Sequence, residues 1–240
     1  MLTSKVALPE TWEFGNYIKA FKALDIEGNN MFDMLFNSIW YTVGGVFLGM
    51  AVSTMVAYVV AKYKFPGGQT IYWIALVTMM IPIVGAMPAQ FKVYTALGII
   101  ESPLLLLAFA GGFGFNFMVL YSFFKSLPSS YIEAGFIDGA GHFTCFLKIM
   151  LPLSRPIVAT MTILSAMQVW NEYLWALTSI TDESKYTLSV GIAIFNKKTE
   201  TVGYTPVFAA LSISALVIVA VYLCMQKQFV KSIAAGAVKG

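Results

Sequence analysis

The stretch EAGFIDGAGHFTCFLKIMLP, residues 133–152, lies between two long apolar runs of a strongly hydrophobic chain. It contains a glutamate, an aspartate, a histidine and a lysine, together with glycine and proline residues. Charged side chains are costly in the hydrocarbon region of a bilayer. We therefore expect this stretch to be a structured connection at a membrane face, and the apolar runs on either side to cross the membrane.

The composition of the whole chain supports an integral membrane protein. Of its 240 residues, 58% are hydrophobic and 11% are charged, whereas soluble domains carry about 25% charged residues. Five stretches have the roughly 20 apolar residues that cross a bilayer as a helix, and they are residues 34–61, 70–89, 104–124, 157–177 and 207–225. The sequence therefore predicts an all-α membrane bundle of five spans. A net charge of only +3 gives no indication of a nucleic-acid partner.

The distribution of positive charge predicts the orientation, because cytoplasmic loops are enriched in Lys and Arg. If residues 133–152 face the cytoplasm, eight Lys or Arg residues lie inside and seven outside, and three of those seven lie in the N-terminal segment 1–33. Without that segment the inside excess is eight to four. This orientation places the C-terminal tail 231–240 in the cytoplasm and residues 1–33 outside. Since no span precedes that external segment, we expect an additional apolar helix ahead of Met1.

The polar segment itself has the signals of a short helix. KSLP, residues 125–128, ends the third span, because proline cannot continue a helix. Ser129 or Ser130 can then cap a new helix, with Glu133 in its first turn. Gly139 and Gly141 end that helix, and two prolines precede the next span. From these residues alone, the segment 128–152 is either a contact site for a partner or a simple interfacial link.

The spacing of the polar segment resembles a known family signature. The membrane subunits of binding-protein-dependent ABC importers carry the pattern EAA---G---------I-LP, which corresponds here to Glu133, Ala134, Gly135, Gly139, Ile149, Leu151 and Pro152. Gly135 replaces the usual second alanine. VWNEYLWAL (169–177) and YTLSVGI (186–192) resemble carbohydrate permeases, and AAGAVKG (234–240) is similar to the end of the maltose-type second permease. The family usually has six spans, and its first helix has no counterpart here, so either this sequence starts after that helix or this member works with five spans.

The resemblance implies a division of labour. Residues 34–230 would form half of a sugar path in the bacterial inner membrane, in contact with lipid and paired with a second permease subunit. Two ATP-binding subunits and an extracytoplasmic sugar-binding protein would complete the importer. The coupling to the ATPase would be carried by Glu133, Ala134, Gly135, Asp138, Gly139, Leu151 and Pro152. The small residues Ala134 and Gly135 would let the helix lie close in a groove of the ATPase, and Glu133 would pair there with a basic group.

The sequence gives no indication of a nucleotide-binding, catalytic or metal site in this chain. No G-x-x-x-x-G-K-[ST] run occurs to cradle phosphates, so we expect ATP and Mg²⁺ on the partner ATPase and no cofactor here. With one histidine and two distant cysteines, Cys145 and Cys224, we expect neither a catalytic group nor a metal site. The alternatives are a permease for a non-sugar solute or, at greater distance, a secondary transporter or membrane enzyme.

A polar stripe in the fourth predicted span is the candidate substrate path. Gln168, Asn171, Glu172 and Trp175 follow the i, i+3, i+4, i+7 pattern of one helix face. An interfacial belt, with the aromatic residues at headgroup level, is the alternative. Asn116 could face the path or form an interhelical hydrogen bond.

Three further features remain open in the sequence. Pro82 and Pro88 could kink the second span. The glycines of GGFGF, residues 111–115, would let neighbouring helices approach closely. Residues 181–205 would either reach the binding protein or form a solvated loop.

Overall fold

The computed structural model describes residues 13–81, 83–100, 102–110, 114–197, 199 and 203–237. In these residues the protein is a bundle of helices with one two-stranded antiparallel hairpin, β1 (Asp25–Ile26) paired with β2 (Asn29–Asn30). The remaining elements, in chain order, are α1 (Gly15–Ala23), α2 (Met31–Lys62), α3 (Gly68–Met80), α4 (Ile83–Ala96), η1 (Pro103–Ala110), α5 (Phe115–Ser126), α6 (Ser130–Ile137), α7 (His142–Cys145), η2 (Phe146–Met150), α8 (Leu151–Leu153), α9 (Arg155–Asn171), α10 (Leu174–Ser179), η3 (Glu183–Lys185), α11 (Leu188–Lys197) and α13 (Tyr204–Ala237).

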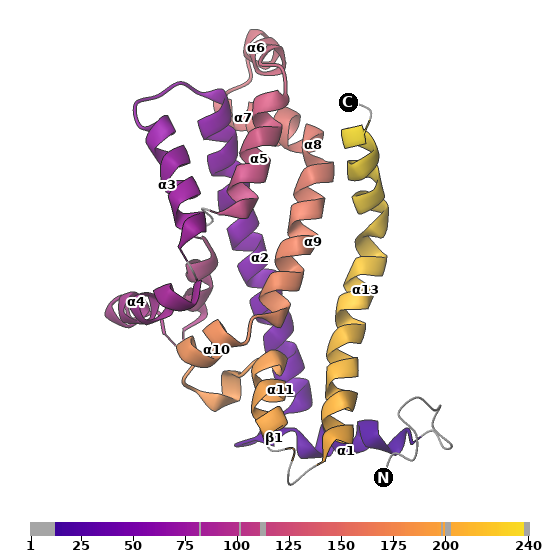
Figure 1. Ribbon diagram of the computed structural model, residues 1–240. Helices are drawn as coiled ribbons and strands as arrows, with labels where there is room; N and C mark the ends of the chain where they lie inside the picture. The colour runs from indigo at the N-terminus through magenta and orange to yellow at the C-terminus, as the bar shows by residue number, and fades with distance from the viewer. Residues whose placement is uncertain are drawn as a thin grey trace.

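Helix α2 is the central element of the bundle (Figure 1). It has 32 residues and is therefore about 48 Å long. A capping box starts it: the Asn30 side chain accepts from the backbone N–H of Phe32 at 2.8 Å and of Asp33 at 3.3 Å, while the Asp33 carboxylate accepts from the backbone N–H of Asn30. These bonds satisfy N–H groups that the first helical turn leaves without partners. Helices α5 and α9 and the 3₁₀ helix η1 pack along α2.

The core is divided between the two ends of the bundle. At one end, Phe117, Leu120 and Phe124 of α5 are fully buried against α2 and η2. At the other end, α1, α11 and α13 pack around fully buried residues that include Met34 and Leu188. Figure 1 shows α6 and the C-terminal end of α13 at the first end, here named the α6 end. It shows α1, β1 and α11 at the opposite end, here named the α1 end.

Two helices in the described part of the chain are long and apolar enough to cross a membrane, Met31–Lys62 and Tyr204–Leu223. The first contains the span predicted at residues 34–61, and α13, to which the second belongs, contains the span predicted at 207–225. Two bent pairs of helices could each supply one more span, which gives two to four candidate spans by length and composition. The mostly helical bundle agrees with the prediction, and the number of five spans stays a prediction.

The three other predicted spans are interrupted. The span predicted at 70–89 is two helices, α3 and α4, whose axes are bent by 119°. Pro82 lies outside the described residues, and Pro88 lies inside α4. The span predicted at 104–124 consists of η1 and the 12-residue α5, and residues 111–113 of GGFGF lie outside the described residues.

The span predicted at 157–177 ends early, because α9 stops at Asn171. The backbone carbonyl of Trp170 accepts a hydrogen bond from the Ser189 hydroxyl at 2.5 Å. The indole N–H of Trp170 donates to the Ser214 hydroxyl at 3.0 Å. These tertiary bonds hold the last turn of α9, and Glu172 then leaves the helical region with φ −76° and ψ 96°.

Candidate functional site

Helix α6 is the short helix that the polar segment predicts. Ser129 occupies the N-cap position, and its backbone carbonyl accepts from the N–H groups of Ile132 and Glu133. Its side chain makes no capping hydrogen bond, so the predicted side-chain cap does not form. At the other end, Gly139 has a φ of +82°, and the following residue, Ala140, donates to the carbonyl of Gly135 at 2.9 Å. This left-handed turn is the common end of a helix and favours glycine.

The two faces of α6 differ in chemistry. Glu133, Ala134 and Asp138 are exposed, whereas Ile132 and Gly135 are buried. The outer face therefore presents two carboxylates, a small residue and the exposed apolar side chain of Ile137, at the extreme end of the bundle (Figure 1).

Gly135 is packed inward. A Cβ atom on it would lie 2.7 Å from Cδ1 of Ile149 and 2.9 Å from the sulfur of Cys145. Of the two small residues predicted to face a partner, Gly135 is therefore buried inside the protein and only Ala134 is exposed. Cys145 has a free thiol that is fully buried in this contact. The structure does not describe the side chain of Cys224.

Leu151 and Pro152, the last two signature residues, belong to the connection between α6 and α9. The π-helix η2 leads into α8, and the axis then bends by 79° into α9. At the bend, the buried Ser154 hydroxyl donates to the carbonyl of Met150 at 2.7 Å. Both signature residues are half-buried. They therefore lie outside the exposed face of α6.

An aromatic cluster that the sequence analysis did not identify joins α6 to α2. The Tyr63 hydroxyl lies 2.9 Å from the Tyr58 hydroxyl and 3.1 Å from Nδ1 of His142. The His142 ring also contacts Phe136, with centroids 4.8 Å apart. The Lys62 ammonium donates to the carbonyl of Leu127, just ahead of α6. Tyrosines near the end of a span are typical of an interfacial belt. Their position in the sequence therefore does not predict their contact with His142.

The stripe predicted as one face of the fourth span is divided between two helices. Gln168 and Asn171 are exposed near the end of α9, and the Asn171 amide donates to the carbonyl of Met167 in its own helix at 2.7 Å. Glu172 lies in the break, where its carboxylate accepts from the backbone N–H of Trp175 at 3.0 Å. Trp175 lies in the first turn of α10 and packs against Phe109, with ring centroids 5.0 Å apart. The prediction of a single continuous face is therefore wrong.

Asn116 forms the interhelical hydrogen bond that was the alternative to a path-facing role. Its amide nitrogen donates to the Ser165 hydroxyl at 2.8 Å and so joins α5 to α9.

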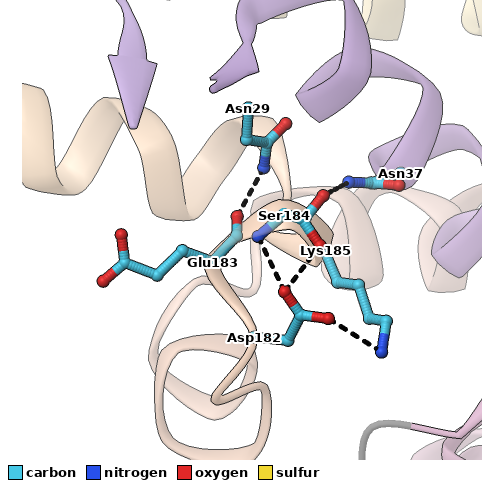
Figure 2. A network of polar contacts seen from close by, with 6 residues as sticks. All are labelled: Asn29, Asn37, Asp182, Glu183, Ser184 and Lys185. Carbon is cyan, nitrogen blue, oxygen red and sulfur yellow. Dashed lines mark hydrogen bonds and ion pairs between the residues drawn. The ribbon is translucent and has the colours of Figure 1, made fainter. Parts of the chain in front are cut away.

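A polar network fixes the segment after α10 at the α1 end (Figure 2). The amide of Asn29 donates to the carbonyl of Glu183 at 2.6 Å, and that of Asn37 donates to the carbonyl of Ser184 at 3.0 Å. Asp182 accepts from the hydroxyl and backbone N–H of Ser184 and pairs with Lys185 at 3.0 Å. The Ser184 hydroxyl and the Lys185 ammonium hold the pKa of Asp182 below its usual value.

Helix α11 continues this docking. Leu188, Val190, Ile192 and Phe195 are buried, and the backbone N–H of Leu188 donates to the Ser38 hydroxyl at 2.7 Å. The described part of residues 181–205 is thus mostly a packed structure rather than a solvated loop. Within the described residues, no group of three or more His, Cys, Asp and Glu side chains is arranged to hold a metal ion.

Comparisons with known proteins agree on one family. The family described as binding-protein-dependent transport system inner membrane component matches residues 26–235. The chain is 32% identical to the diacetylchitobiose uptake system permease protein of Streptomyces coelicolor, over 98% of this chain and 78% of that protein. It is 34% identical to the maltose/maltodextrin transport system permease protein of Vibrio parahaemolyticus, over 86% of this chain and 72% of that protein. A solved bacterial ABC transporter involved in the import of the acidic polysaccharide alginate contains a similar chain, with a TM-score of 0.76 and 26% identity over 94% of this chain and 83% of that one.

Proposed function

Because the chain belongs to the family of binding-protein-dependent transport system inner membrane components, we propose that it is a permease subunit of a sugar ABC importer that receives ATP-driven motion through α6. It is a transport subunit, and ATP hydrolysis belongs to a separate subunit of the importer. The exposed acidic face of α6 is the observation that carries the coupling role, since this face protrudes from the bundle and contacts no described residue that would neutralise it.

The outer face of α6 suits a groove with a basic side chain on the ATPase. Glu133 and Asp138 supply negative charge, and Ala134 between them permits a close backbone approach. Gly139 turns the chain back toward the bundle directly after the helix. Breaking one side of a buried charge pair at an interface costs about 2–5 kcal/mol, which is enough to detach or uncouple the ATPase.

The orientation proposed from the positive charges places the α6 end in the cytoplasm and the α1 end outside. The fold supports this proposal, because the C-terminal end of α13 lies at the same end as α6 (Figure 1). The network around Asp182 and Lys185 then faces an extracytoplasmic sugar-binding protein. A second permease subunit would complete the path, and two ATP-binding subunits would carry ATP and Mg²⁺.

The substrate class follows from the relatives that transport diacetylchitobiose and maltodextrins. Gln168 and Asn171 remain the candidates for contact with a sugar, because their polar side chains are exposed on α9. Glu172 caps α10, Trp175 packs against Phe109, and Asn116 binds Ser165, so we assign these three residues to the scaffold of the path.

Charge reversal on α6 tests the proposed function. In a strain that depends on this importer for growth on maltose or diacetylchitobiose, Glu133→Lys should abolish uptake and reduce the ATPase that co-purifies with the permease. Glu13→Lys makes the same charge change on an exposed residue at the α1 end and should leave ATPase retention unchanged. Normal uptake by Glu133→Lys at wild-type expression would overturn the coupling role of α6.

A further inference from the structure

A cavity of about 180 Å³ lies between α2, η1 and η3 near the α1 end. Its walls include Asn37, Trp40 and Tyr41 from α2, Ser102 and Leu106 from the segment that contains η1, and Lys185 from η3. Figure 2 shows Asn37 and Lys185 on neighbouring segments of this wall. The cavity is separate from the exposed face of α6 and from Gln168 and Asn171 on α9.

Two polar atoms of the wall are available to a ligand. The Asn37 amide nitrogen donates to the carbonyls of Ser184 and Tyr186, which fixes the side chain. Within the described part of the chain, its amide oxygen accepts no hydrogen bond, and the Tyr41 hydroxyl has no hydrogen-bond partner. Neither atom is a fully buried polar atom that lacks a partner. One fixed acceptor and one hydroxyl that can donate or accept therefore border the cavity.

The described residues of the wall combine these groups with a flat apolar surface and carry no unpaired charge. Trp40 is half exposed, at 50% of its surface, and an indole ring offers a large apolar face to a ligand. Among the described residues of the wall, the only ammonium is that of Lys185, and it is paired with Asp182 at 3.0 Å. That pairing removes the net positive charge that a carboxylate or phosphate ligand would need. The wall thus favours a neutral ligand with hydroxyl groups on its edge and C–H groups on its face.

We propose that this cavity is an entry subsite for the terminal ring of a neutral saccharide. The pyranose face lies on Trp40, and ring hydroxyls bond to the Asn37 amide oxygen and the Tyr41 hydroxyl. The volume is below the 300–1,000 Å³ of sites for larger ligands, so it holds one ring rather than a chain. This inference rests on the proposed function, because only an external α1 end places the cavity where a binding protein releases sugar.

Direct binding tests the subsite. The assembled permease–ATPase complex in lipid nanodiscs, without the binding protein, is titrated calorimetrically with maltose and with diacetylchitobiose. The sugar that the complex transports should bind to the wild type, and Trp40→Ala should raise its Kd about tenfold or more. Trp40→Phe keeps an aromatic face and should restore much of the binding. Tyr41→Phe removes one hydroxyl without changing the packing and should raise Kd about threefold.

The control is Trp73→Ala on α3, which removes the same side chain at a similar exposure, 55%, away from the cavity. It should leave Kd unchanged. If the complex transports sugar but Trp40→Ala and Trp73→Ala bind it equally, the subsite is wrong while the proposed function stands. If the complex with its binding protein transports neither sugar, the proposed function fails before the subsite is reached.

Discussion

Substitution of Gly135 by alanine tests the packing that positions α6. Helix propensity alone predicts that this change stabilises the protein by about 1 kcal/mol, because glycine is the poorer helix former. The structure predicts the opposite. The new Cβ would lie 2.7 Å from Ile149 and 2.9 Å from Cys145, both closer than real Cβ contacts.

The size of the effect follows from the two contacts. The end of the Ile149 side chain can move because the residue is half-buried, but Cys145 is fully buried. Overpacking of a buried site costs about 1–3 kcal/mol. After the gain in helix propensity is taken into account, we expect Gly135→Ala to destabilise the permease by about 1 kcal/mol.

The assay is the melting temperature of the purified permease in detergent, followed by tryptophan fluorescence. A loss of about 1 kcal/mol corresponds to about 2–4 °C for a chain of this size. Gly135→Ala combined with Ile149→Val, which removes the clashing Cδ1, should recover part of that loss, and the double-mutant cycle measures the coupling. Ala134→Gly, on the exposed face, is the control: its change in melting temperature measures the effect of helix propensity without a change in packing. A higher melting temperature for Gly135→Ala would refute the inward packing of α6.

Two further predictions concern the end of α9 and the aromatic cluster. Gln168→Cys and Asn171→Cys should react with a small aqueous thiol reagent in the assembled importer. Ala166→Cys should not react, because Ala166 borders an apolar cavity. Equal labelling of all three cysteines would contradict the assignment of Gln168 and Asn171 to the path. Tyr63→Phe removes the hydroxyl that lies 2.9 Å from the Tyr58 hydroxyl and 3.1 Å from Nδ1 of His142. The loss of both hydrogen bonds, at about 1 kcal/mol each, should lower the melting temperature by about 4–8 °C; an unchanged melting temperature would show that these bonds do not hold α7.

Local signals in the sequence predict the parts of the fold that local interactions determine. The apolar runs at 34–61 and 207–225 lie within α2 and α13. Pro128 and Gly139 bracket α6, because proline ends the preceding helix and glycine permits the left-handed turn. The spacing around Glu133 also predicted the family correctly.

Tertiary contacts determine the parts that the sequence did not predict. Helix α9 ends where Ser189, 19 residues later in the chain, binds the carbonyl of Trp170, and no local residue marks that end. Apolar composition does not distinguish one long helix from the bent pair α3 and α4, and only Pro82 and Pro88 indicate a kink in that span. The inward face of Gly135 depends on Cys145 and Ile149, which are brought under α6 by the π-helix η2.

The central claim is that the outer face of α6 touches the ATPase. A photo-crosslinking amino acid at Ala134, on that exposed face, should form a covalent adduct with the ATP-binding subunit in the assembled importer. The same amino acid at Glu13, exposed at the α1 end, should form none. An adduct at Ala134 that contains no ATPase, or an equal ATPase adduct from Glu13, would contradict the claim.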